Sequence, residues 1–258
     1  MKKRKDQIIL GIILLITSAL LYALNYAIFR DVHHIFMFMT EDLAFIPIEI
    51  LVVTLIIDRL IEHREKKNMF NKLNMIIGIF FDEIGNDVLK IFTKVDPNIE
   101  KTRRQYIINN KWMDGDYKKI LKDAKDYVYR INIKDIDLKE FTELIWRKRD
   151  FFIRLLQNQV LLEHETFTEL LQAMIHLQDE LKNRRKFGEL TKEDIEHLRH
   201  DMERVYGFLS YEWLVYMRYL QNEYPYLFMT ALINNPYDNR ESKEIEENIR
   251  KLQLKNYV

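Results

Sequence analysis

Residues 43–57, LAFIPIEILVVTLII, form an apolar stretch that contains one proline, Pro47, and one carboxylate, Glu49. About two hundred residues rich in charge follow it, whereas the residues before it are largely apolar. An apolar helix that ends in a charged segment is typical of a membrane span. We therefore predict a span over residues 43–60.

A longer apolar segment precedes this stretch. Residues 8–29 are 22 residues without a charge, and they follow the basic sequence MKKRK. A helix of that length extends roughly 33 Å, enough to cross the hydrocarbon core of a bilayer. The alternative is a cleaved signal peptide, which has a similar basic start. The two apolar segments together predict a transmembrane hairpin over residues 1–57.

The charges that flank these segments predict their orientation. Basic residues precede the first segment, and Arg59, Arg64, Lys66 and Lys67 follow the second. Basic flanks belong on the cytoplasmic side, so we expect a multi-pass protein of the cell membrane with both termini in the cytoplasm. The connection 30–42 would then be external, with Thr40 as the N-cap of the second helix.

Glu49 is the centre of a predicted polar site inside the membrane. By helix rise it lies at the depth of Tyr22, Asn25 and Tyr26 of the first segment. An isolated carboxylate in hydrocarbon costs several kcal/mol unless it is protonated, paired or hydrated. One interpretation is a hydrogen bond that holds the hairpin together. The other is an ion or proton site in an oligomeric pore.

A row of small residues indicates where the spans associate. Ala19, Ala23 and Ala27 recur every four residues in the first segment. They share one helix face, along which a second helix can approach closely. We expect a homo-oligomer packed through this face.

The rest of the composition predicts an all-α fold. The chain has 258 residues, of which only six are glycine and four are proline. Few chain-breaking residues favour long helices. We predict a helical stalk over 58–96 that continues from the second span and associates as a coiled coil, a cytoplasmic helical bundle over 97–233 and a charged tail helix over 234–258. Apolar periodicity places the bundle helices at about 98–112, 117–131, 137–160, 166–186 and from Thr191 onward.

Charge and motif content exclude several classes of function. Forty basic residues balance forty acidic ones, so the chain lacks the basic field of a nucleic-acid-binding protein. Cysteine is absent, which excludes thiolate metal sites and cysteine nucleophiles. No phosphate-binding loop, nucleophile elbow or zinc-protease motif occurs in the sequence. We expect no enzyme activity and no cofactor.

Four polar residues of the bundle are candidates for a metal site. His176 and Glu180 are four residues apart, and His197 and His200 are three apart. Pairs of this kind on two helices build metal centres inside helical bundles. The repeated Glu-x-x-His pairs of a carboxylate-bridged site are missing, however. We favour surface or capping histidines, with metal binding as the alternative.

Two stretches carry a resemblance to other proteins: LAFIPIEILVVTLIIDRLIEHRE (43–65) and YPYLFMTALINNP (224–236). They resemble an uncharacterised prokaryotic family of two-span membrane proteins with a helical cytoplasmic domain. The resemblance implies this architecture over nearly the whole chain. It implies no activity and no site residues.

The sequence thus predicts a membrane-anchored helical scaffold or interaction protein. We expect it to lie in the lipid bilayer, to self-associate and to present its bundle to a cytoplasmic protein partner. The alternative is an oligomeric ion channel or transporter subunit that uses Glu49.

Overall fold

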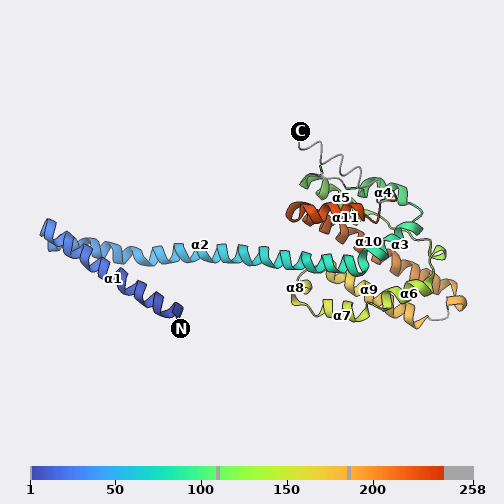
Figure 1. Ribbon diagram of the computed structural model, residues 1–258, viewed down its shortest axis with the longest axis horizontal. Helices are drawn as coiled ribbons and strands as arrows, with labels where there is room; N and C mark the ends of the chain where they lie inside the picture. Colours follow the sequence, from blue (N-terminus) through green and yellow to red (C-terminus); the bar gives the residue numbers. More distant parts are fainter. Residues whose placement is uncertain (1, 109–110, 185–186, 241–258) are drawn as a thin grey trace. The chain divides into compact units, whose positions relative to one another are not determined.

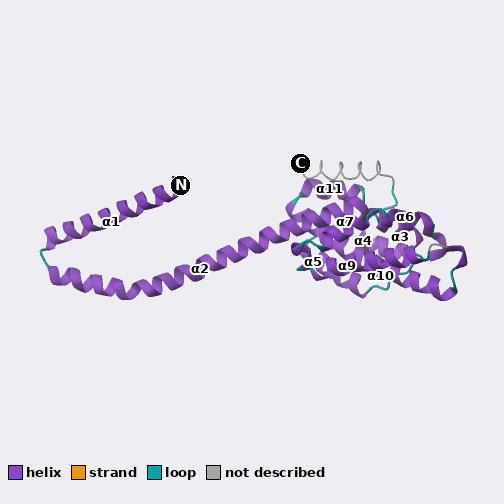
Figure 2. Cartoon of the chain, turned by 90° about the horizontal axis from the view of Figure 1, so that it is seen from below, coloured by secondary structure: helices purple, strands orange, loops and turns teal. Residues whose placement is uncertain are grey.

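The computed structural model describes residues 2–108, 111–184 and 187–240. Within these ranges the regular secondary structure is helical, and no strand occurs (Figure 2). The prediction of an all-α fold is confirmed. The tail helix predicted at the C-terminus lies mostly outside the described residues.

The chain divides into two compact units, Met1–Lys67 and Asn68–Val258. Helix α2, Val32–Phe80, contributes residues to both units. The predicted boundaries after residues 57 and 96 differ from this division, and they stay predictions.

The N-terminal unit contains α1, Lys2–Phe29, and the first part of α2. The two helices are joined by only two residues, of which Arg30 has a positive φ of 50°. Because α2 begins at Val32, most of the predicted loop 30–42 is helical. Thr40 is therefore not an N-cap but lies inside the helix, where its hydroxyl donates to the carbonyl of Phe36 (2.7 Å).

One helical segment among the described residues has the length and composition of a membrane span. It is Ile9–Ile28 of α1, twenty residues with a mean hydropathy of 2.0. The stretch 43–57 does not qualify, because Asp42 and Asp58 bound it and Glu49 lies within it. Any eighteen-residue helical segment that contains it has at least three charges. The predicted two-span hairpin is therefore not confirmed, and one candidate span stands in its place.

Apolar side chains are exposed on every side of both helices in the N-terminal unit. Four consecutive residues of α2, Ile50–Val53, are each about half exposed or more, from 48% to 61%. Consecutive side chains on a helix point about 100° apart, so these four cover its whole circumference. Continuous apolar exposure of this kind marks a surface that contacts lipid or another protein.

The C-terminal unit begins with the last turns of α2. A π-helical turn, Phe81–Gly85, joins α2 to α3, Asn86–Val95. Phe80 and Gly85 at the two ends of this turn have right-handed helical dihedral angles, so the helix continues through it. Ile77, Phe80 and Ile84 are buried in the core. One side of the apolar sequence 75–81 is thus covered by the helices that follow it, whereas Met75 and Ile79 are exposed.

Several of the remaining helices are shorter than the apolar pattern predicts. The predicted helix 137–160 is divided at residues 147–148 and 157–158 into three helices, and the predicted helix 117–131 ends at Asp126. Residues 127–132 are not helical, although Tyr129 and Ile131 are buried. The bounds are α4 Ile99–Tyr106, α5 Asp114–Asp126, η2 Ile133–Asp135, α6 Leu138–Trp146, α7 Arg149–Leu156, α8 Gln159–Leu162, α9 Glu165–Asn183, η3 Phe187–Glu189, α10 Lys192–Glu223 and α11 Pro225–Ile233.

Helices α9 and α10 form the centre of the C-terminal unit and lie side by side (Figure 1). Helix α10 begins directly after Thr191, as predicted, and Thr191 and Asp194 form a capping box there: the Asp194 amide donates to the Thr191 hydroxyl (3.1 Å). The N-cap of α9 is His164, whose Nδ1 accepts from the Phe167 amide (3.3 Å), so the helix begins at Glu165, one residue before the predicted start. Apolar residues of both helices fill the core between them: Leu170, Leu171, Met174, Leu177, Leu181, Leu198, Met202, Val205 and Leu209.

The π-helical turn generates a stability prediction. A Cβ added at Gly85 would lie 2.6 Å from a ring carbon of Phe81 and 2.9 Å from one of Phe80. Both side chains are buried, at 0% exposure for Phe80 and 1% for Phe81, so a shift of either ring disturbs the core. We expect Gly85→Ala to destabilise the unit by about 1–3 kcal/mol, less the roughly 0.5–1 kcal/mol that alanine contributes to helix propensity.

Gly115→Ala is the matched control, because a Cβ there meets nothing within 4 Å. It should leave the stability unchanged or raise it slightly. The measurement is urea unfolding of the full chain in nonionic detergent, followed by the fluorescence of Trp112, Trp146 and Trp213. Equal midpoints for the two variants would contradict the close packing at Gly85.

Candidate functional site

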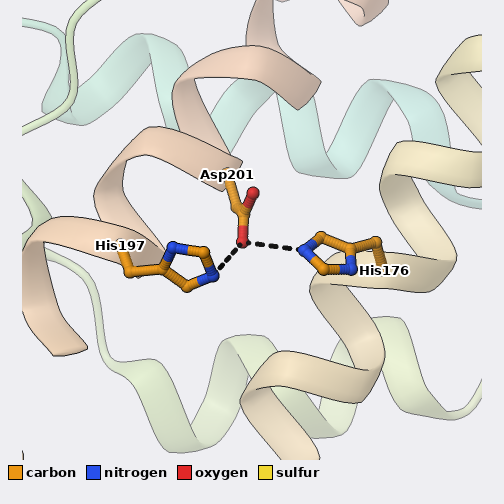
Figure 3. A group of neighbouring side chains, drawn as sticks. All are labelled: His176, His197 and Asp201. Carbon is orange, nitrogen blue, oxygen red and sulfur yellow. Dashed lines mark ion pairs between the residues drawn. The ribbon is translucent and has the colours of Figure 1, made fainter.

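Three polar side chains converge between α9 and α10 (Figure 3). His176 belongs to α9, and His197 and Asp201 lie one turn apart on α10. The Oδ2 atom of Asp201 lies 3.3 Å from Nε2 of His176 and 3.4 Å from Nε2 of His197. One ligand atom from each of the three residues therefore lies within 4.8 Å of the others.

The carboxylate of this cluster is buried, whereas the imidazoles are accessible. The Asp201 side chain is 9% exposed, and those of His176 and His197 are 45% and 51% exposed. Oδ2 of Asp201 has no hydrogen-bond partner among the described residues. Its contacts with the two imidazoles have the distances of ion pairs and do not meet hydrogen-bond geometry. The cluster therefore contains a buried, unsatisfied oxygen that faces two nitrogen ligands.

The four metal candidates predicted from sequence have different positions. His176 and His197 belong to the cluster. Glu180 lies at its edge, with Oε2 at 3.4 Å from Nε2 of His197, but its carboxylate is also paired with Arg184. His200 lies outside the cluster, 3.5 Å from Glu196.

Asp201 is not among the residues predicted from sequence. His197 and Asp201 are four residues apart, as are His176 and Glu180. This shared spacing places both residues of each pair on one helix face. The packing of α9 on α10 then determines which residues of the two faces come into contact. That packing cannot be predicted from the spacing alone.

A cavity of about 690 Å³ lies elsewhere in the unit, between residues 124–130, the start of α9 and the middle of α10. Its wall is aromatic and charged. Glu203 in the wall is held by its neighbours, accepting from the Ile131 amide (3.1 Å) and pairing with Arg130 (3.2 Å). Gly207 allows the ring of Tyr129 to approach α10, since a Cβ there would lie 3.3 Å from it.

Glu212 of α10 is a fully buried carboxyl group. The hydroxyl of Thr166, which also lines the cavity, donates to Oε1 of Glu212, whereas Oε2 has no partner within the described part of the chain. Removal from water raises the pKa of Glu212 to about 7 because burial disfavours the charged form. The group therefore changes its charge near neutral pH.

The polar residues predicted to lie inside the membrane are exposed in the N-terminal unit. Tyr22 is 43% exposed and Tyr26 51%, and Asn25 and Glu49 are exposed as well. In the described ranges, the structure records no hydrogen bond or ion pair that links Glu49 to the other three. The hydrogen-bonded hairpin stays a prediction.

The small-residue face of α1 is also exposed, at Ala19, Ala23 and Ala27. Its role in self-association stays a prediction too.

Comparison with known proteins identifies relatives for both parts of the chain. The family profile described as the N-terminal helical domain of MJ1433 matches residues 2–61. The profile described as the C-terminal helical domain of the uncharacterized protein MJ1433 matches residues 69–233. The Methanocaldococcus jannaschii protein described as uncharacterized protein MJ1433 is 40% identical over 240 residues, which cover 93% of this chain and 96% of that protein. No solved structure matches the chain.

The buried Glu212 predicts a pH dependence of stability. Its pKa is about 7 in the folded chain against 4.5 for an ordinary glutamate. The folded state therefore retains a proton that the unfolded state has lost, and stability falls as pH rises from 4.5 to about 7. We expect this fall in the free energy of unfolding to be on the order of 3 kcal/mol, and we expect Glu212→Gln to abolish it.

The measurement is urea unfolding of the full chain and of the variant across this pH range. The difference between their free energies of unfolding should grow with pH and level off above neutrality. Glu169→Gln, which changes an exposed carboxyl group of the same cavity, is the control and should run parallel to the unmodified chain. A constant difference for Glu212→Gln would contradict the shifted pKa.

Proposed function

The chain belongs to the family of the uncharacterized protein MJ1433, and from this premise we propose that it is a membrane-anchored scaffold. In this proposal α1 anchors the protein, copies associate through their N-terminal units, and the C-terminal helical unit binds a protein partner without catalysing a reaction. The family descriptions name no activity. The proposal therefore rests on the difference between the exposed side chains of the N-terminal unit and those of the C-terminal unit.

The observation that supports the anchor is the contrast between the two units. In the N-terminal unit, apolar side chains such as Leu15 (73%), Leu20 (65%) and Leu43 (65%) are exposed. In the described part of the C-terminal unit most of the large apolar side chains are gathered in one buried core. A bilayer is the environment that covers a largely apolar helix of twenty residues at all angles, and the basic residues 2–5 suit its cytoplasmic face.

A finer part of the proposal is that 43–57 also enters the membrane and brings the C-terminal unit back to the cytoplasm. Apolar exposure around the whole helix supports this, as do the basic residues after it. Fifteen residues extend roughly 22 Å as a helix, which is less than the hydrocarbon thickness of about 30 Å. The second crossing therefore requires local thinning of the bilayer around α2.

Self-association is supported by the exposed row Ala19, Ala23 and Ala27, because small residues let two helices pack closely in lipid. The C-terminal unit would then be presented in several copies. A multivalent scaffold binds a partner more tightly than its single sites do.

A second candidate function is ion conduction by an oligomer. It is favoured by Glu49, whose exposed carboxylate has no recorded ion pair in the described part of α2. A carboxylate at this depth needs a counter-charge, a proton or water. An oligomeric pore would supply water, whereas a scaffold would supply a hydrogen bond from a neighbouring copy.

Membrane topology can be measured cleanly because the chain contains no cysteine. Single cysteines would replace His33, near the start of α2, and Lys119, an exposed residue of α5. With two crossings, a membrane-impermeant maleimide added to intact cells should label the cysteine at 33 and not the one at 119. Lysed cells, in which both should react, are the control.

Labelling of both positions in intact cells would mean one crossing and would overturn the finer topology. Extraction of the protein from membranes by alkaline carbonate would overturn the anchor itself.

The two candidate functions differ in the effect of Glu49→Gln. For a scaffold, we expect purified oligomers in liposomes to pass no ions, and the substitution to change only the oligomeric state. The readouts are ion flux and light scattering in detergent, with Glu41→Gln as the control outside the apolar stretch. An ion flux that Glu49→Gln alters, with assembly unchanged, would replace the scaffold by the channel.

A further inference from the structure

We propose that His176, His197 and Asp201 bind one divalent transition-metal ion of the zinc type. Two imidazole nitrogens and one carboxylate oxygen are ligands that Zn²⁺ commonly takes in proteins. The fourth position would be open to water or to a ligand from solution. This inference does not depend on the proposed scaffold function.

Two of the three distances between ligand atoms in the cluster, those to Asp201, fit tetrahedral coordination, and all three atoms lie within 4.8 Å of one another. Zinc bonds of about 2.0–2.1 Å at the tetrahedral angle place neighbouring ligand atoms roughly 3.3–3.4 Å apart. Oδ2 of Asp201 lies 3.3 Å and 3.4 Å from the two Nε2 atoms. An ion can therefore enter with small rotations of the two exposed imidazoles, while Asp201 stays in place.

The buried oxygen is an independent reason to expect a cation. A buried polar atom without a hydrogen bond costs about 1–3 kcal/mol, and more when it is charged. Oδ2 of Asp201 is such an atom, and the two ring nitrogens nearest to it point toward it (Figure 3). A metal ion bound to all three atoms would compensate the negative charge of the carboxylate and the missing hydrogen bond of Oδ2.

The helices hold the ligands on a rigid support. Leu177, next to His176, is buried in the core, and so are Leu198 and Met202 on either side of the Asp201 turn. Side chains fixed by such packing keep a metal geometry at little entropic cost. The imidazoles, about half exposed, leave a path from solvent to the site.

The competing explanation is an ion pair between Asp201 and protonated histidines. Charged groups near the cluster come from both helices and the turn between them: Glu180, Arg184, Asp194 and Arg204. Arg204 lies 3.6 Å from Oδ1 of Asp201 and supplies part of the counter-charge. It does not contact Oδ2, so the orphaned oxygen still faces the histidines alone.

The test uses the full chain in detergent, stripped of metal by a chelator. Zn²⁺ is titrated by calorimetry, and Co²⁺ is added as a spectroscopic probe, because tetrahedral Co²⁺ has intense visible absorption bands. The expected result is one ion per chain and an unfolding temperature that rises with the concentration of Zn²⁺.

Substitutions identify the ligands. His176→Gln, His197→Gln and Asp201→Asn should each weaken binding at least about 10-fold, since a lost ligand should cost no less than a lost residue that only hydrogen-bonds a ligand. His200→Gln is the matched control, because His200 is an exposed histidine of α10 outside the cluster. It should bind as the unmodified chain does. Far-ultraviolet circular dichroism and unfolding temperatures without metal show that each variant folds.

Two outcomes would overturn the proposal. One is a stripped chain that binds neither ion with one-to-one stoichiometry. The other is binding that survives in His176→Gln and His197→Gln while both remain folded, which would assign the ion to histidines outside the cluster.

Discussion

The C-terminal unit depends on two adjacent aromatic side chains, Phe80 and Phe81, at the join between α2 and the π-helical turn. Phe80 packs edge-on against Phe167 of α9, with ring centroids 5.2 Å apart. Phe81 stacks on Tyr216 of α10, with centroids 5.6 Å apart and planes inclined by 12°. Neighbouring side chains on a helix diverge by about 100°, so two consecutive residues can contact two different helices. The π-helical turn, which begins at Phe81, adds a residue to the helical repeat and so shifts the faces of the residues after it. As a result Val88 and Phe92 of α3 continue the buried stripe.

The same helix therefore carries two kinds of surface. Up to Ile61, the apolar side chains of α2 are exposed on all sides, whereas from Leu73 they are buried on one side. The charged residues 58–67 separate the two segments. In an aqueous monomer the first segment would be unstable, since water penalises each exposed apolar side chain. The first segment is thus suited to lipid or to other copies, and the second to a folded core.

The all-α fold class and the start of α10 at Thr191 were predictable from sequence, because both depend on local signals. Helix boundaries were not. Tyr127, Val128 and Ile131 continue the apolar spacing of α5 but lie in a non-helical segment, where the Ile131 amide donates to the Glu203 carboxylate far along the chain. In the candidate metal site, spacing identified His176 and His197 but not their shared partner. Asp201 becomes a partner only through the packing of α9 on α10, which no local pattern encodes. Sites whose side chains come together only through tertiary contacts could therefore not be predicted from sequence.

Helix α10 carries four buried polar residues, Asp201, Glu203, Ser210 and Glu212, where apolar side chains would avoid the cost of desolvation. Two of them are explained by the fold. Glu203 pairs with Arg130 and Arg199, and Ser210 donates to the Tyr206 carbonyl (2.7 Å) and accepts from the Tyr237 hydroxyl (2.5 Å). Asp201 and Glu212 differ, because each retains an oxygen without a hydrogen bond among the described residues. Glu212 can lower that cost by taking a proton, as its raised pKa indicates. Asp201 faces two imidazoles that can coordinate a cation, so a bound ion is the compensation that its surroundings can supply.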